Sequence, residues 1–330
     1  MRVRILPGVA DVRDGVSRYT ASLVAALRKQ GVEIAGQGDD YDILHLVAAH
    51  RYDPEWREAK RRGKRLVVTV HDLIPEHFGL KGPQYAGVAE RREILDAADA
   101  IIAVSQYTKD DIIATCGIPA AKIHAIHNGV AQDETRLSAV HLESPPPPFL
   151  LWVGRRAGYK NFFWFVWAVA PLLWRTNWRV VCTGGQAFGR KERLLLAMLG
   201  LSRRFKVVCA DEAQMAQLYR EAICLVMSSK MEGFGLPLIE AMANDCPVVA
   251  PHAHVFPEIA GDAAAYYELG NAKEMRRQIA LCTESRFRAA LMANGRLQAG
   301  RYSWEKCAEA VCKTYEGVMN DRNCDKCHAH

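Results

Sequence analysis

The sequence predicts an α/β protein built from two doubly wound, Rossmann-like domains, and three observations support this prediction. The chain has 330 residues, whereas a single hydrophobic core rarely serves more than about 250 to 300 residues. Short runs rich in valine and isoleucine alternate with amphipathic stretches, a pattern typical of parallel sheets with crossover helices. A proline run, "SPPPP" at 144–148, separates these strands into two groups.

The expected strands are short apolar runs. In the N-terminal half they are "VRIL", "DILHLV", "RLVVTV", "AIIAV" and "KIHAIH". In the C-terminal half they are "FLLWVG", "RVVCTGG", "FKVVC", "CLVM" and "PVVA". We therefore expect an N-terminal domain over 1–144, a proline linker over 145–148 and a C-terminal domain over 149–303.

The composition favours a cytoplasmic protein that does not bind nucleic acid. No apolar run reaches the roughly 20 residues of a spanning helix, and the N-terminus lacks the apolar segment of a signal peptide. Eight of the ten cysteines are scattered singly through apolar segments, which favours buried thiols in a reducing compartment. The formal net charge of +6 comes without the basic and aromatic pattern of a nucleic-acid-binding module.

The tail "CDKCHAH" carries four potential metal ligands, Cys324, Cys327, His328 and His330. Zinc sites of this kind usually take their second pair of ligands from a distant Cys-x2-Cys, and the sequence has no such second pair. We expect a frayed terminus here and no bound metal.

Polar and glycine residues follow four of the predicted strands. His71 and Asp72 follow "RLVVTV", Arg155 and Lys160 follow "FLLWVG", Gly184 follows "RVVCT", and the loop "SSKMEGFGL" follows "CLVM". Ligands of open parallel sheets bind beyond the carboxyl ends of the strands. We therefore expect the functional residues at this edge.

The loop after "CLVM" leads into a helix that starts near Pro237, whose fixed φ suits a first turn. Unpaired amide groups and the helix dipole make such a start suitable for an anion such as a diphosphate. Glu232 precedes the turn and Glu240 lies in the helix. They could simply be a solvated loop residue and a favourable first-turn carboxylate. These explanations lose weight because Glu240 interrupts an apolar helix face and Glu232 adjoins glycines that allow close approach of a ligand.

The segment "EGFGLPLIEAMANDCPVVAP" (232–251) resembles the Glu-x7-Glu motif of the retaining GT-B glycosyltransferases of group 1 and family 4. Other segments agree in order and spacing across almost the whole chain, among them "DGVSRYTASLVAAL", "TVHDLIPEHF", "AVSQYTKDDII", "VGRRAGYKNF" and "YSWEKCAEAV". The resemblance implies a GT-B fold, in which two Rossmann-like domains face a cleft and the acceptor binds mainly to the N-terminal one. It also implies a final helix at 304–320 that crosses back to the N-terminal domain, followed by a flexible tail at 321–330.

The same resemblance assigns roles in donor binding. Glu232 would bind hydroxyls of the donor sugar, and Glu240 would bind the ribose hydroxyls of the nucleotide. Arg155 and Lys160 would stabilise the departing diphosphate, which gains negative charge as the glycosidic bond breaks. The other residues implied at the donor are Gly15, Gly184, Gly233, Phe234, Gly235 and Leu236. Many relatives have a Gly-Gly pair where this chain has Asp14-Gly15, and a simple loop glycine explains Gly15 equally well.

His71 matches a family histidine that reaches the donor sugar, and Asp72 would orient it or face the acceptor. We expect Arg156 to be a bystander without a role at the site, and His127 to be structural. The mechanism implied is front-face substitution, in which the acceptor hydroxyl attacks from the side that the diphosphate leaves and no enzyme nucleophile is needed. No cofactor or metal is implied, because the Asp-x-Asp sequence at 40–42 precedes its strand.

The sequences of the segments "TVHDLIPEHF" and "VGRRAGYKNF" are most similar to those of bacterial polysaccharide mannosyltransferases. This favours GDP-mannose as the donor over a UDP-sugar, with a growing polysaccharide or a lipid-linked oligosaccharide as the acceptor. Two alternatives stay open: a sugar-nucleotide epimerase, which needs no acceptor, and a non-catalytic subunit that binds a sugar nucleotide. A NAD-dependent dehydrogenase is disfavoured because no Gly-x-Gly-x-x-Gly follows the first strand.

Two segments suggest contact with an anionic surface on the inner face of the cytoplasmic membrane. The expected helix at 160–178 carries two apolar stripes, one of Phe162, Phe165, Val169 and Leu172 and another of Trp164, Trp167, Pro171 and Trp174. The second stripe could lie in the core, or it could meet a membrane or a partner subunit. The basic segment 51–65 could be a solvated helix, or it could bind lipid headgroups or a lipid-linked acceptor.

Overall fold

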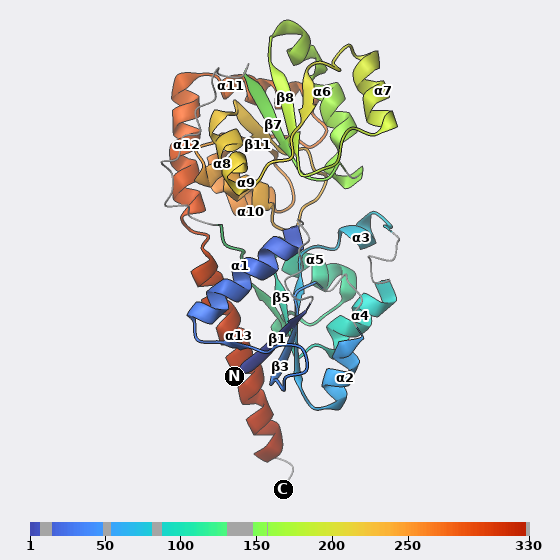
Figure 1. The fold of residues 1–330 in the computed structure, drawn as a ribbon, viewed down its shortest axis with the longest axis vertical. Coiled ribbons are helices and arrows are strands. Elements are labelled where there is room, and N and C mark those ends of the chain that lie inside the picture. Colours follow the sequence, from blue (N-terminus) through green and yellow to red (C-terminus); the bar gives the residue numbers. More distant parts are fainter. Residues whose placement is uncertain (7–14, 49–53, 81–87, 131–147, 157, 328–330) are drawn as a thin grey trace. The chain divides into compact units, whose positions relative to one another are not determined.

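The computed structural model describes residues 1–6, 15–48, 54–80, 88–130, 148–156 and 158–327. The chain forms two compact units, one of Met1–Gly129 with Tyr302–His330 and one of Val130–Arg301 (Figure 1). The expected boundary at 144 and the linker as far as 147 lie outside the described residues. Within the described residues, no helix has both the length and the apolar character needed to cross a bilayer.

The first unit contains a six-stranded parallel sheet in the order β2-β1-β3-β4-β5-β6. Its strands are β1 (Arg2–Leu6), β2 (Glu33–Ile34), β3 (Ile43–Leu46), β4 (Arg65–Val70), β5 (Ala100–Ala103) and β6 (Ile123–Ala125). Its helices are α1 (Gly15–Lys29), α2 (Glu55–Arg61), α3 (Ile74–His77), α4 (Val88–Ala97), α5 (Gln106–Cys116) and α13 (Trp304–Cys327). The five expected strands are present.

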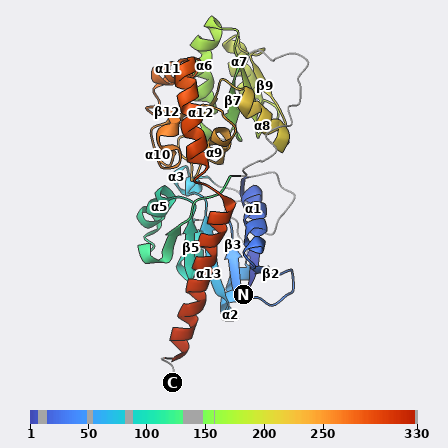
Figure 2. The same cartoon turned by 90° about the vertical axis from the view of Figure 1, so that its left-hand side faces the viewer.

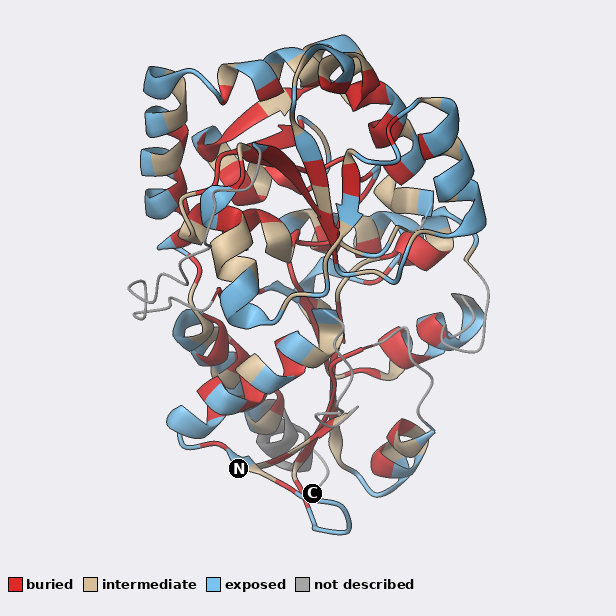
Figure 3. Cartoon of the chain, turned by 45° about the horizontal axis from the view of Figure 1, so that its top comes forward, coloured by how far each residue is buried: buried red, intermediate tan, exposed pale blue. Residues whose placement is uncertain are grey.

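Helices cover both faces of this sheet, which explains why its strands are continuous apolar runs. One face packs against α2, α4 and α5, through residues such as Leu95 and Ile112. The other face packs against α1 and α13, through residues such as Leu23 and Val311. Buried residues accordingly lie on the strands and on the inward faces of the helices, whereas the outward faces are exposed (Figure 3).

The helix α13 packs beside α1 on the first unit (Figure 1 and Figure 2). Its Tyr315 hydroxyl lies 2.6 Å from Nδ1 of His45, a fully buried residue of β3. The helix continues to Cys327, beyond the expected end at 320. Buried contacts along α13 therefore attach this C-terminal segment to the N-terminal sheet.

The segment before α13 is held by residues 127–129 of the same unit. The ring of His127 packs edge-on against Tyr302, with centroids 5.4 Å apart. A Cβ on Gly129 would lie 2.2 Å from the backbone nitrogen of Trp304, so only glycine allows this approach. The "HNGV" segment therefore has a structural role at the start of α13.

The second unit contains a parallel sheet of six strands in the order β12-β11-β10-β7-β8-β9. Its strands are β7 (Phe149–Val153), β8 (Arg179–Thr183), β9 (Phe205–Val207), β10 (Cys224–Val226), β11 (Val248–Pro251) and β12 (Ala264–Tyr267). Its helices are α6 (Phe162–Arg175), α7 (Arg190–Met198), α8 (Glu212–Glu221), α9 (Leu236–Ala243), α10 (Phe256–Ala260), α11 (Ala272–Leu281) and α12 (Ser285–Ala299). Together the two sheets confirm the predicted α/β class.

The two strands that the sequence did not predict, β2 and β12, both lie at the edge of a sheet. The strand β2 has only two residues, and β12 is the alanine-rich "AAYY". Edge strands pair on one side only, so they can be short and need no run of β-branched residues.

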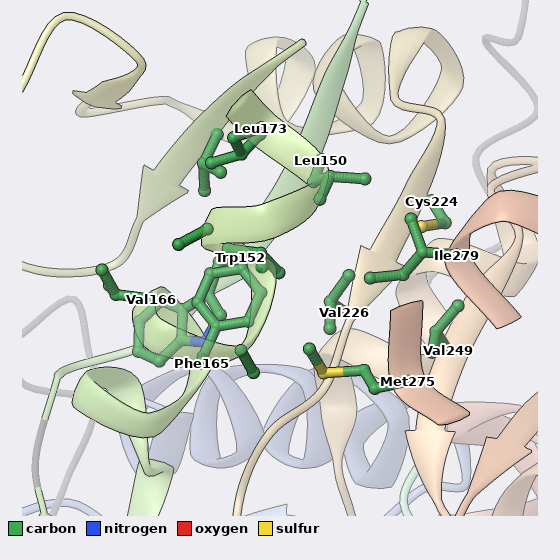
Figure 4. Close-up of a cluster of buried hydrophobic side chains, with 14 of the residues drawn as sticks. Leu150, Trp152, Phe165, Val166, Leu173, Cys224, Val226, Val249, Met275 and Ile279 are labelled. Carbon is green, nitrogen blue, oxygen red and sulfur yellow. The ribbon is translucent and has the colours of Figure 1, made fainter. Parts of the chain in front are cut away.

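The core of the second unit forms around Trp152 of β7 and the inner face of α6 (Figure 4). Phe162, Phe165 and Val169 are fully buried, so the first expected stripe of α6 lies in the core. The ring of Trp152 packs against Phe162 with centroids 5.0 Å apart.

The second expected stripe of α6 is divided between core and surface. Trp164 is half-buried and stacks on Tyr267 of β12, with centroids 6.1 Å apart and an interplanar angle of 15°. Trp167 and Trp174 are exposed. Packing of α6 against α11 and β12 thus partly covers Trp164. Pro171 is half-buried, and Trp167 and Trp174 stay exposed.

Candidate functional site

The loops that follow β7, β8 and β10 lie at one edge of the second sheet, because these three strands are neighbours in the order β10-β7-β8. The sequence placed Arg155, Lys160, Gly184 and Glu232 in these loops. The structure brings the loops together, as the following contacts show.

The first contact is between the glycines that end β7 and β8. The amide of Gly154 donates to the Thr183 carbonyl at 2.9 Å. A Cβ on Gly184 would lie 3.1 Å from the backbone of Gly154, and both glycines have positive φ, +132° and +78°. Glycine is thus required at position 184 for the close approach of the two loops. This packing role is separate from the expected position of Gly184 near the donor.

The second contact joins the predicted cation to the predicted sugar-binding carboxylate. Nζ of Lys160 lies 2.6 Å from Oε1 of Glu232, and the two side chains are 12% and 10% exposed. The same carboxylate oxygen accepts a hydrogen bond from Oγ of Ser229 at 2.5 Å. Charge-assisted hydrogen bonds shielded from water are among the stronger ones in proteins, so this arrangement holds both groups in place.

A chain of hydrogen bonds behind the ion pair fixes the backbone of Lys160. The indole nitrogen of the buried Trp152 donates to Oγ of Ser228 at 3.0 Å. Ser228 in turn donates to the Lys160 carbonyl at 2.8 Å, and the Lys230 amide donates to the Tyr159 carbonyl at 2.8 Å. These bonds couple the loops after β7 and β10.

The loop after β10 ends in a tight turn at the start of α9. Gly235 occupies the N-cap position with a φ of 84°, a left-handed conformation that favours glycine. Gly233 and Phe234 are buried, and Leu236 is the first residue of the helix, followed by Pro237. First-turn amides have no intrahelical acceptor, and Gly235 offers no side-chain cap, so this start suits an anion.

Glu240 lies in α9 and faces α8. Oη of Tyr219 donates to Oε2 of Glu240 at 2.9 Å. Tyr219 is 2% exposed, so its hydroxyl holds the carboxylate in one orientation from within the core. Sequence reasoning assigned no role to Tyr219, Trp152, Ser228 or Ser229.

The two arginines after β7 differ in their surroundings. Arg155 is exposed and forms no ion pair with any residue in the described ranges. Arg156 is buried against Glu192, with Nε 2.8 Å from Oε1, and its guanidinium lies 4.9 Å from the Phe188 ring centroid. Arg156 is therefore structural, and Arg155 is the arginine available to an anion.

His71, Asp72 and Gly15 belong to the first unit. Nε2 of His71 lies 2.8 Å from the Val47 carbonyl, and the imidazole packs edge-on against Tyr19. Oδ1 of Asp72 accepts from the Ile74 amide at 3.0 Å at the start of α3. Gly15 begins α1, is exposed and has nothing within 4 Å of a Cβ position, so packing does not require glycine there.

The backbone at Asp72 is anchored by a residue that sequence reasoning missed. The guanidinium of Arg91 donates to the Asp72 carbonyl at 3.0 Å and lies 2.9 Å from Oε2 of Glu76. Arg91 is 1% exposed, so this ion pair is buried. It fixes the turn that presents His71 and Asp72.

The Asp-x-Asp sequence precedes β3, as expected, and lies among cations. Oδ1 of Asp40 is 2.8 Å from Nζ of Lys64, whose hydrogen bond lowers the pKa of Asp40 below its usual value. Oδ2 of Asp42 accepts from the Arg2 amide at 2.8 Å. No group of three or more potential metal ligands occurs among the described residues, and the side chains of the Cys/His tail lie outside them.

Two family models match this sequence. The model described as "Glycosyl transferases group 1" matches residues 133–298. The model described as "Glycosyltransferase Family 4" matches residues 35–134. Together they account for most of both units.

Relatives and solved structures agree with these matches. The O-antigen chain mannosyltransferase B of Escherichia coli is 25% identical over 94% of this chain and 87% of its own length. The D-inositol 3-phosphate glycosyltransferase of Streptomyces bingchenggensis is 29% identical over 84% and 67%. The crystal structure of Anabaena HepE in complex with UDP-glucose has a TM-score of 0.77 at 17% identity, covering 96% of this chain and 100% of that one. This structural similarity confirms the predicted fold.

Proposed function

The chain belongs to the group 1 glycosyltransferases, and from this membership we propose that it moves a hexose from a nucleotide-diphosphate sugar, with retention of configuration, to a saccharide or lipid-linked acceptor. The observation that carries the proposal is the contact between Lys160 and Glu232. It puts a cation suited to a diphosphate beside a carboxylate suited to sugar hydroxyls, next to the start of α9.

The diphosphate would bind to Lys160, Arg155 and the first-turn amides of α9. Its negative charge grows as the bond from the sugar to the β-phosphate breaks, so these groups stabilise the transition state more than the ground state. Glu232 would accept hydrogen bonds from donor hydroxyls, and Glu240, held by Tyr219, would accept them from the ribose.

The chemical step would be a front-face substitution. The acceptor oxygen bonds to the anomeric carbon on the side from which the diphosphate departs, and a phosphate oxygen takes the hydroxyl proton. A carboxylate paired with a lysine is a weak nucleophile, because the ion pair stabilises its charge. The ion pair of Glu232 therefore suits a binding role and differs from the two-carboxylate arrangement of glycosidases. His71 would contact the donor sugar, with Asp72 orienting its loop.

We favour GDP-mannose as the donor, because the Escherichia coli relative is named a mannosyltransferase of the O-antigen chain and aligns over 94% of this chain. A UDP-sugar is the second candidate, because HepE was crystallised with UDP-glucose. An O-antigen-like polysaccharide or a lipid-linked oligosaccharide is then the acceptor, and the reaction takes place on the cytoplasmic side of the membrane.

We also propose that transfer needs no bound metal or other cofactor. Asp40 is engaged by Lys64 and Arg62, and Asp42 by the amide of Arg2. These carboxylates lie at the amino end of β3, whereas ligands of such sheets bind at the carboxyl ends. The cations at the donor diphosphate would then be Lys160 and Arg155.

The test is calorimetric binding of GDP, UDP, ADP and dTDP to the wild type, to Glu240→Ala and to the control Glu221→Ala, which removes an exposed glutamate of α8. We expect one nucleotide to bind well, to bind more weakly to Glu240→Ala and to bind unchanged to the control. Binding of none would contradict the proposal and favour a non-catalytic subunit. Conversion of the matching sugar nucleotide to an epimer without acceptor would favour an epimerase.

A further inference from the structure

The outer faces of α6 and α7 form an exposed apolar surface, which we call the α6–α7 surface. It consists of large side chains that are 45% to 76% exposed: Phe163, Trp167, Trp174, Leu194 and Met198. Large apolar residues scattered singly are ordinary on a protein surface, but neighbouring ones mark an interaction site.

The two helices that carry these side chains pack against each other (Figure 1). Phe163 and Trp167 are four residues apart on α6, as are Leu194 and Met198 on α7, so each pair shares one helix face. The indole nitrogen of Trp174 donates to the Leu199 carbonyl at 3.0 Å, which ties the end of α6 to the end of α7. The exposed apolar side chains of the two helices therefore belong to neighbouring elements.

The segment that carries this surface is strongly basic. Residues 161–210 contain eight basic side chains and one acidic one, a formal charge of +7, whereas the whole chain carries +6. The single acid, Glu192, is paired with Arg156 and its side chain is 12% exposed. The exposed basic residues of the two helices are Arg175, Arg190, Lys191 and Arg193.

Two of these cations are placed where they do not help the helix. Arg190 and Lys191 occupy the first turn of α7, where the positive end of the helix dipole disfavours cations. Both are exposed. An external anion would offset this repulsion.

We propose that the α6–α7 surface binds an anionic lipid bilayer. Tryptophan is favoured at the boundary between headgroups and acyl chains, because its ring is apolar and its N–H is polar. Basic side chains beside it would contact lipid phosphates. This combination of exposed indoles, aliphatic side chains and net positive charge on one segment fits a membrane better than a protein partner, which would need acids to match. The inference does not depend on the identity of donor or acceptor.

The basic segment of the first unit is a weaker candidate. Among its described residues, Arg57 pairs with Glu93, Lys60 and Arg65 pair with Asp99, and Arg62 and Lys64 pair with Asp40. Its only tryptophan, Trp56, is buried. These charges are largely compensated within the protein, so this segment should contribute little.

The test is flotation of the full-length protein with vesicles of equimolar phosphatidylcholine and phosphatidylglycerol, compared with vesicles of phosphatidylcholine alone. We expect binding to the anionic vesicles that weakens as salt rises. Arg190→Gln with Lys191→Gln should reduce the partition coefficient roughly thirty-fold, since each basic residue near such a surface contributes about a factor of five. Because these cations oppose the dipole of α7, their removal should not lower the thermal unfolding midpoint.

A second variant, Phe163→Ser with Trp167→Ser, should also lose binding while it remains folded. The matched controls are Leu297→Ser, which removes an apolar side chain that is 73% exposed on α12, and Arg61→Gln with Arg62→Gln at the end of α2. Both controls should bind as the wild type does. Equal binding to the two kinds of vesicle, or loss of binding only in the α2 variant, would overturn the proposal. A dimer of the wild type would also overturn the proposal, if the wild type binds no vesicles and Phe163→Ser with Trp167→Ser dissociates the dimer in sedimentation. The surface would then join two copies of the chain.

Discussion

Nζ of Lys160 lies 2.6 Å from Oε1 of Glu232, although the two residues are 72 positions apart in the chain. Both side chains are largely buried, so each charge depends on the other for compensation. A diphosphate that binds Lys160 would compensate part of the positive charge that Glu232 compensates now. The Glu232 carboxylate would then be available to the hydroxyls of the donor sugar. The ion pair thus positions both groups and, under the proposed function, would link phosphate binding to sugar binding.

A double-mutant cycle tests this relationship. Lys160→Met leaves a buried carboxylate without its cation, so we expect a loss of about 3 kcal/mol in the free energy of unfolding. Combining it with Glu232→Gln removes both charges and should restore most of that loss. Transfer activity should fall by about a hundredfold or more in both single variants and in the double variant. Urea unfolding and initial rates measure the two effects. A double variant no more stable than Lys160→Met would show that the ion pair does not couple the two residues.

Glu232→Gln also tests whether Glu232 is a nucleophile. We propose that it binds the donor, so the variant should transfer slowly and accumulate no glycosyl-enzyme. Added azide should neither restore turnover nor yield a glycosyl azide, and mass spectrometry of the protein and products measures both. Formation of a glycosyl azide of inverted configuration would mean that a covalent step occurs and that the front-face mechanism is wrong.

Tyr219→Phe removes the hydroxyl that donates to Glu240 at 2.9 Å and changes little else in the core. If Glu240 binds the ribose, loss of this orienting hydrogen bond should weaken nucleotide binding by about fivefold, corresponding to about 1 kcal/mol. The maximal rate at saturating donor should change much less, because Tyr219 does not contact the reacting atoms. Calorimetry and steady-state kinetics separate these quantities. Unchanged nucleotide affinity would argue against a role for Tyr219 in positioning Glu240.

Much of the fold follows from local sequence patterns. Strands such as β4 and β10 are buried on both faces, so they read as continuous apolar runs and could be predicted. Because the loops after parallel strands meet at one edge, the positions of Lys160, Glu232 and Gly184 in the candidate site could also be predicted. The edge strands β2 and β12 could not, because a strand paired on one side needs no such run.

The contacts within the site could not be predicted, because they join segments far apart in the chain. Nothing near Ser228 in the sequence indicates that it accepts from Trp152, which is 76 residues away. In the same way, the spacing of tryptophans on α6 does not reveal that Tyr267 covers Trp164 and leaves Trp167 exposed. Pairing of the basic segment with Asp40 and Asp99 is likewise a property of the folded chain.

Gly129→Ala tests the close approach between residue 129 and the start of α13. The added Cβ would lie 2.2 Å from the Trp304 nitrogen and 2.6 Å from its Cα, so the backbone must shift. We expect a loss of about 2 to 3 kcal/mol in the free energy of unfolding. Gly317→Ala is the matched control, because Gly317 lies in α13 and has nothing within 4 Å of its Cβ position. This control should be neutral or stabilising by up to about 1 kcal/mol, since alanine favours helix more than glycine does. Equal effects of the two substitutions would mean that the contact at Trp304 does not matter.

His45 should make the stability of the protein depend on pH. It is fully buried between Tyr315 and Thr69, with its two ring nitrogens 2.6 Å and 2.8 Å from their hydroxyls. Burial, helped by the nearby His71, lowers the pKa of His45 from 6.5 to about 3. The unfolded chain therefore binds a proton that the folded chain does not bind between these two values, and stability falls as the pH is lowered through this range.

The slope that His45 contributes is about 1.4 kcal/mol for each pH unit below 6.5. His45→Gln cannot titrate, so its unfolding free energy should decline more gently with acid, even if its stability at neutral pH is lower. Denaturant unfolding of both proteins at several pH values between 6.5 and 3 gives the two slopes. Because every other group is shared, the difference between the slopes isolates His45. If the unfolding free energies of the two proteins changed with pH in parallel, His45 would be protonated as readily in the folded protein as in the unfolded chain. The contact between His45 and Tyr315 of α13 would then not need a neutral histidine.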